Sequence, residues 1–144
     1  MKKFTLVILT FAMMLTGTKV SAQGKYGADS AQCVTNLSFY SEYFKQNKYD
    51  EALPSWRKAY KFCPPTASQN LLINGATLLR HLITKNASNA TYRAALVDSL
   101  LTIMDVRAQY YPKNAVTALN NKGQYLFNYV KNDPKKLYDG FEGI

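Results

Sequence analysis

The sequence predicts an all-α protein whose helices form antiparallel hairpins stacked side by side. From Cys33 onward, apolar residues recur every three or four positions, which is the period of an amphipathic helix. Prolines stop the helical pattern at Pro64 and Pro112, because proline lacks a backbone N–H and constrains the residue before it. The order helix, turn, helix, proline at an interval in the thirties is typical of a helical solenoid. From Tyr40 to Gly75 the interval is 35 residues, and from Gly75 to Gly123 it is 48, which indicates an insertion in the second unit.

The composition favours one folded domain. The chain has 144 residues, of which 47% are hydrophobic and 13% aromatic, enough for a core and too many for a disordered chain. Its formal charge is +9, yet arginine is scarce and the lysines are scattered. Nucleic-acid binding favours clustered Lys and Arg, so we do not expect a nucleic-acid partner.

The N-terminus predicts a cleaved bacterial signal peptide over residues 1–22. Lys2 and Lys3 precede a mostly apolar run that starts at Phe4, and small residues at Ser21 and Ala22 favour cleavage before Gln23. As a helix, this run would span roughly 18 Å, which is short for a bilayer core of about 30 Å. We therefore expect an exported, periplasmic protein. Cleavage removes three lysines and no acid, which leaves fifteen basic and nine acidic side chains and a formal charge of about +6.

Residues 23–32 read as a linker, and the first hairpin follows. A turn at 46–48 separates two helices, and Asp50 is expected to cap the second helix. We expect Pro54, near the start of that helix, to be tolerated. The apolar positions are Cys33, Leu37, Tyr40 and Phe44 in the first helix and Leu53, Trp56, Tyr60 and Cys63 in the second.

The second hairpin is expected to begin at Thr66 or Ser68, either of which can cap a helix. Residues 84–91 are polar and predict a loop. The apolar stripe before this loop comprises Leu72, Gly75, Ala76, Leu79, Leu82 and Ile83. The stripe after it comprises Tyr92, Leu96, Leu100, Ile103, Arg107 and Tyr110.

A third hairpin is expected after Pro112. Asp133 and Pro134 then predict the cap and the first position of a last, short helix. The first helix of this hairpin has its predicted stripe at Val116, Leu119, Gly123, Leu126, Phe127 and Val130.

Residues 43–65 resemble a tetratricopeptide repeat, and the whole chain resembles exported helical-repeat proteins of Gram-negative bacteria. The resemblance implies a right-handed solenoid of about two and a half repeats over residues 33–144, with Trp56 wedged between the two helices of its hairpin. The residues expected to pack the repeats are Tyr43, Phe44, Tyr49, Ala52, Trp56, Ala59 and Pro64, with Gly75 and Gly123 as the small residues at which backbones nearly touch.

The two cysteines are expected to form a disulfide. Cys33 begins the first helix and Cys63 ends the second, so an antiparallel hairpin places them at the same end, and export implies an oxidising compartment. The alternative is a pair of buried free thiols.

We find no pattern that predicts catalysis, a metal or a cofactor. His81 is the only histidine and has no ligand or nucleophile beside it in the helix, so it is expected to pack or to lie on the surface. Asp98 and Asp105 lie two helical turns apart, too far for a paired-carboxylate site. Ser30, after Asp29, resembles an acceptor for bacterial O-glycosylation.

The sequence thus predicts an exported scaffold that binds a protein or peptide partner in a concave groove lined by the first helix of each repeat. The alternative is a basic structural or assembly component at the outer membrane or cell wall, or the N-terminal part of a longer solenoid that self-associates through an uncapped C-terminal end. The expected groove residues are Asn36, Ser41, Asn74, Arg80, Asn121, Lys122, Gln124 and Asn128.

Overall fold

The computed structural model describes residues 24–144, and the predicted signal peptide, residues 1–22, lies outside them. The described chain is all-α, as predicted. Its helices are α1 (Ser30–Lys45), α2 (Tyr49–Phe62), α3 (Gln69–Lys85), α4 (Ala90–Tyr110), α5 (Ala115–Val130) and α6 (Pro134–Glu142), with a short 3-10 turn η1 (Pro112–Asn114) between α4 and α5.

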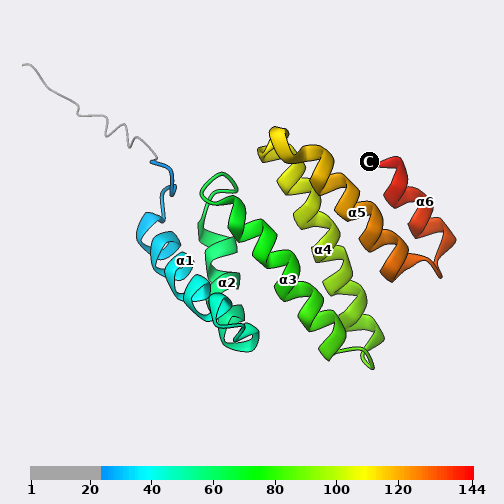
Figure 1. The fold of residues 1–144 in the computed structure, drawn as a ribbon, viewed down its shortest axis with the longest axis horizontal. Helices are drawn as coiled ribbons and strands as arrows, with labels where there is room; N and C mark the ends of the chain where they lie inside the picture. The colour runs from blue at the N-terminus through cyan, green and yellow to red at the C-terminus, as the bar shows by residue number, and fades with distance from the viewer. Residues whose placement is uncertain (1–23) are drawn as a thin grey trace, which may run out of the picture.

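The helices lie in a row in chain order, from α1 at one end to α6 at the other (Figure 1). The most extensive packing joins α1 to α2, α3 to α4 and α4 to α5. The junction of α2 with α3 is less extensive, and it connects the first hairpin to the rest of the chain. A few specific contacts at this junction therefore hold the first hairpin in place.

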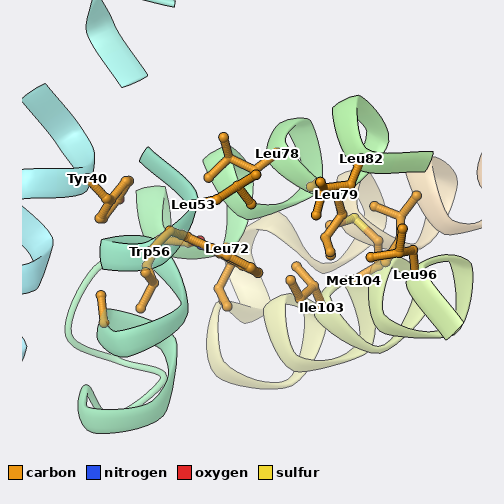
Figure 2. Close-up of a cluster of buried hydrophobic side chains, with 14 of the residues drawn as sticks. Tyr40, Leu53, Trp56, Leu72, Leu78, Leu79, Leu82, Leu96, Ile103 and Met104 are labelled. Carbon is orange, nitrogen blue, oxygen red and sulfur yellow. The ribbon is translucent and has the colours of Figure 1, made fainter. Parts of the chain in front are cut away.

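The described core runs through the row as one cluster of buried side chains (Figure 2). It extends from Tyr40 of α1 through Trp56 and Leu72 to Leu96 and Met104 of α4. Leu126 and Val130 of α5 continue the cluster. Successive helices thus bury their apolar stripes against one another, and this burial is the dominant force that favours the row.

The disulfide predicted between Cys33 and Cys63 is present, and it links the start of α1 to the end of α2. The two Cα atoms are 4.8 Å apart, and both residues are buried. Ala52 and Ala59 are fully buried in α2. The first hairpin is thus covalently closed at one end.

Trp56 packs differently from the expectation. We expected its indole between the two helices of its own hairpin, but its indole N–H donates a 2.9 Å hydrogen bond to the Leu71 carbonyl of α3. The ring also lies against Gly75, where an added Cβ atom would be 2.6 Å from Trp56 Cζ2. Gly75 therefore makes room for a side chain of the preceding hairpin, and not for a neighbouring backbone.

Asp50 does not cap α2, which corrects the sequence prediction. The helix begins at Tyr49, and no side chain caps it. The Asp50 carboxylate instead accepts hydrogen bonds from Lys85 Nζ at 2.8 Å and lies 3.1 Å from His81 Nε2. These contacts with Lys85 and His81 hold the pKa of Asp50 below its usual range. The carboxylate thus ties α2 to the end of α3.

The bounds of two predicted segments, the linker and the α3–α4 loop, differ in the structure, and so does one predicted helix cap. Helix α1 begins at Ser30, so the expected linker 23–32 is wrong for its last three residues. Gly27, with a φ of 73°, turns the chain before α1 so that its backbone lies against the ring of Pro64. The loop expected at 84–91 shortens to 86–89, because Asn89 caps α4 by accepting a hydrogen bond from the Tyr92 N–H. Ser68 precedes α3 without a side-chain cap bond.

Several residues of the predicted apolar stripes are exposed. The side chain of Tyr43, expected to fill the face of α1, is 39% exposed, while Phe44 and Tyr49 pack together with ring centroids 5.3 Å apart. Tyr92 and Tyr110, at the ends of the α4 stripe, are also exposed.

Helix α5 buries only part of its predicted stripe: Leu126 and Val130 are buried as predicted, and Ala118 and Lys122 are buried in addition. Val116 and Phe127 are 74% and 60% exposed. Gly123 faces the side chain of Phe141 and not a backbone, and Gly140 of α6 lies against Leu126. Helix α6 has Asp133 as its cap and Pro134 as its first residue, as predicted.

Replacing Gly75 should weaken the junction of α2 with α3. Gly75→Ala places a methyl group inside the volume of the Trp56 ring, and overpacking of this kind costs about 1–3 kcal/mol, more than the helix propensity of Ala gives back. Urea denaturation should show a lower free energy of unfolding. Gly123→Ala is the matched control, because its Cβ would be 3.3 Å from the half-exposed ring of Phe141, and its stability should be unchanged or higher. Equal losses of stability in both variants would contradict the packing of the Trp56 ring against Gly75.

Removing the disulfide should destabilise the chain. Its closed loop spans a sequence separation of 30 residues, for which chain entropy predicts a loss of about 3–4 kcal/mol in Cys33→Ser/Cys63→Ser. Thermal and urea denaturation measure the loss, and dithiothreitol should lower the stability of the wild type but not of the variant. Mass spectrometry of the non-reduced protein that found two free thiols would contradict the bridge.

The Asp50 contacts should make stability depend on pH at the acid end. Because the pKa of the folded state lies below the ordinary 3.8, Asp50 stabilises the fold fully above pH 3.8 and loses this effect as pH falls through the lowered pKa. Asp50→Asn should therefore unfold at a lower urea concentration than the wild type at pH 7, and the difference should disappear in strong acid. Glu51→Gln, at an exposed neighbouring residue, should match the wild type at every pH.

Candidate functional site

Two arginines and two tyrosines meet at the end of the helices that is marked by the α3–α4 loop. We call them the arginine–tyrosine surface: Arg80 of α3, Arg93 of α4, and Tyr125 and Tyr129 of α5. The tyrosines are four residues apart and therefore lie on one face of α5, with ring centroids 6.4 Å apart. Three helices thus contribute to a single cluster.

Each guanidinium of this surface lies over a tyrosine ring. Arg80 Cζ is 5.7 Å from the ring centroid of Tyr125, and Arg93 Cζ is 5.9 Å from that of Tyr129. A hydrogen bond between Arg80 and Tyr129 raises the pKa of Arg80, so this arginine remains charged. Cation–π attraction of this kind, about 0.5–1 kcal/mol at exposed sites, holds the guanidinium planes in place.

Four aspartates pair with lysines, and the ion pairs of the described chain include no arginine. Lys85, Lys122 and Lys135 form ion pairs with Asp50, Asp105 and Asp139, and Lys136 pairs with Asp98. Within residues 24–144, no arginine forms an ion pair. Arg107 is buried, whereas the guanidiniums of Arg80 and Arg93 keep N–H groups free for an external anion.

A hollow of about 330 Å³ adjoins the surface beside Tyr129 and Arg93. Its other wall carries Asp133 and Lys136. The Asp133 carboxylate accepts a hydrogen bond from the Lys136 N–H as the cap of α6, and Lys136 Nζ bonds to Asp98. Arg93 is therefore the cation at this hollow that has no acidic partner.

Two of the predicted groove residues, Asn36 and Lys122, are buried. Asn36 is 5% exposed, and its amide donates a 2.7 Å hydrogen bond to the Gln32 carbonyl of its own helix. Lys122 is 7% exposed, and its ammonium group lies 2.8 Å from Asp105 of α4. Both side chains make their polar contacts within the fold. The burial of Asn36 disagrees with its predicted place in a groove, whereas Lys122 adjoins a hollow beside Asp105 and Gly140.

The other predicted groove residues are scattered. Asn74 is partly buried and bonds to Tyr40, whose pKa is raised by burial and lowered in part by this bond. Ser41 lies beside Tyr40 at another hollow, near the start of α3. Asn121 is partly buried, and Gln124 and Asn128 are exposed on α5. Arg80 is the one predicted residue in the arginine–tyrosine surface.

Sequence reasoning missed Arg93, Tyr125 and Tyr129. The spacing of the two tyrosines was visible in the sequence, because residues four apart share a helix face. Arg93 could not be found in this way, because its position beside Tyr129 depends on the packing of α4 against α5.

His81 lies at the helix junction described above, with its ring also in edge contact with Tyr49 at 5.5 Å between centroids. This agrees with the packing role expected from the sequence.

Across the described part of the chain, no three His, Cys, Asp or Glu side chains are grouped to hold a metal ion. None of its helices combines the length and the apolar character needed to cross a membrane. Ser30 is exposed, but it is the first residue of α1 and does not lie in a linker.

The best-defined feature of the arginine–tyrosine surface is its two guanidiniums, those of Arg80 and Arg93. Both lie over tyrosine rings, and neither has an acidic partner within residues 24–144. Comparison with known proteins adds no relative, since no family model, no curated protein and no solved structure matches this chain.

Proposed function

We propose that this protein is an exported scaffold of tetratricopeptide-like hairpins that binds an acidic segment of another protein through the arginine–tyrosine surface. The observation that carries this proposal is the pair of guanidiniums, Arg80 and Arg93, that are held over tyrosine rings and have no acidic partner among the described residues. A guanidinium offers two parallel N–H donors, which match the two oxygens of a carboxylate.

The tyrosines add to the suitability of this surface for a protein segment. Tyr125 and Tyr129 are partly exposed and fixed in place, so they can contact a ligand at little cost in side-chain entropy. Because α3, α4 and α5 present the four residues from rigid helices, the geometry is set before a partner arrives.

Two further observations support the scaffold and its export. The helices pack in chain order, as the hairpins of a right-handed solenoid would. The disulfide suits an oxidising compartment, in agreement with the signal peptide expected at residues 1–22 and with a periplasmic location. The scaffold needs no catalytic group and no cofactor.

Partner crosslinking in the producing bacterium tests the proposal. A photoreactive amino acid at Gln124, exposed one residue before Tyr125, should crosslink one defined protein. The double variant Arg80→Glu/Arg93→Glu should reduce this product about tenfold, because it replaces attraction to a carboxylate by repulsion. Lys61→Glu/Lys113→Glu changes the charge equally at exposed sites near the end of α2 and in η1, at the opposite end of the helices, and should leave the product unchanged.

Two results would contradict the acidic-segment proposal. One is a product that persists in the arginine variant. The other is an equal loss in both variants together with release of the protein from envelope fractions by salt. General attraction to the outer membrane or cell wall would cause the second result, because exposed charges are screened by salt.

A further inference from the structure

A groove lies between α2 and α4, on residues separate from the arginine–tyrosine surface. Its volume is about 500 Å³, and its walls are mostly apolar. Leu79 of α3 contributes to the groove between the two outer helices. The main lining residues are Trp56, Tyr60, Leu79, Tyr92, Leu96 and Ile103.

The groove follows from how the helices pack. Helices α2 and α4 both pack on α3 and make no extensive contact with each other. The Trp56 ring is held by its bond to the Leu71 carbonyl, and Tyr60 stacks on it with centroids 5.6 Å apart. Tyr60 is 36% exposed, and its partial burial raises the pKa of its hydroxyl. The aromatic wall is therefore rigid, as in preformed binding sites.

The rim of the groove has one unpaired charge. Arg57 Nη2 donates a 3.2 Å hydrogen bond to the Tyr92 hydroxyl and thus spans from α2 to α4. No carboxylate of the described chain pairs with Arg57. Asp98 also lines the groove, but it pairs with Lys136. The free charge at the mouth is consequently positive.

We propose that this groove is a second binding site, which takes a bulky apolar side chain of a partner protein with a carboxylate next to it. The apolar side chain fills the space between Tyr60 and Leu96, where its burial drives binding. The carboxylate accepts hydrogen bonds from Arg57, which a neutral or basic neighbour could not do. A bulky apolar side chain alone would match the apolar walls of the groove, but it would leave Arg57 without a partner.

Trp56 is the only tryptophan of the chain and lies in the wall of the groove, so its fluorescence reports an occupant. Random peptides displayed on phage should be selected on the oxidised, full-length mature protein, and the enriched peptides synthesised and titrated. We expect enriched sequences with Phe, Trp or Leu beside Asp or Glu. For this titration the Trp-free peptides are used, and they should change the emission of Trp56.

Variants in the groove, each compared with a control, test whether the peptides bind there. Arg57→Glu should weaken peptide binding about tenfold, whereas Lys58→Glu, an equal charge change at the next exposed residue, should leave it within about twofold of the wild type. Ser99→Trp should block binding by filling the groove from an exposed position of α4, and emission from Trp56 is then replaced by fluorescence anisotropy of a labelled peptide. Circular dichroism confirms that each variant is folded.

Other outcomes overturn this proposal. Peptides that lack an acid, that bind Arg57→Glu as tightly as the wild type, or that leave Trp56 emission unchanged show that the groove does not read this motif. Decanoate that binds where no peptide does would assign the groove to a fatty acid. Self-association that Ser99→Trp abolishes would assign it to a second copy of the chain. The Arg80→Glu/Arg93→Glu variant should bind the peptides normally, so failure of this site and failure of the proposed function are distinguishable.

Discussion

The packing of the Trp56 indole against α3 is the contact on which the arrangement of the helices depends. It joins a hairpin closed by its own disulfide to the remainder of the row, at the junction where helix packing is least extensive. Gly75 admits the ring, the Leu71 carbonyl fixes its N–H, and Asp50 secures the other end of α2 through Lys85 and His81. These apolar and polar contacts together set the position of α2 relative to α3, and with it the width of the groove beside α4.

The charged side chains divide into two groups with different roles. Lysines pair with most of the aspartates and join neighbouring elements, as Lys122 joins α5 to α4 and Lys136 joins α6 to α4. The surface arginines instead contact tyrosines and keep donors free. Exposed ion pairs add little stability, so the lysine pairs matter here chiefly because none of them engages an arginine. Both candidate sites depend on this division.

The sequence was sufficient for the fold class, the disulfide and the cap of α6, because each rests on local period, spacing or turn chemistry. It failed where a residue has a choice between partners. Asp50 had the position of a cap, but tertiary cations outcompeted the backbone N–H groups. In α5 the predicted stripe included Val116 and Phe127, whereas contact with both α4 and α6 selected Ala118 and Lys122 for burial. The groove between α2 and α4 could not be predicted, because it depends on how both helices pack against α3, and the sequence does not show this packing.

The disulfide lies in the first hairpin, at one end of the row of helices. The two ends of the described row therefore differ in how firmly their helices are held. Helix α6 has nine residues, none of them buried, whereas the disulfide keeps the two helices of the first hairpin joined even when their noncovalent contacts break. Among the described helices, local opening is therefore expected at α6 before the first hairpin. A protease that cleaves locally opened segments would reach α6 and its neighbour α5 before the first hairpin, so the arginine–tyrosine surface would be lost before the groove of α2 and α4.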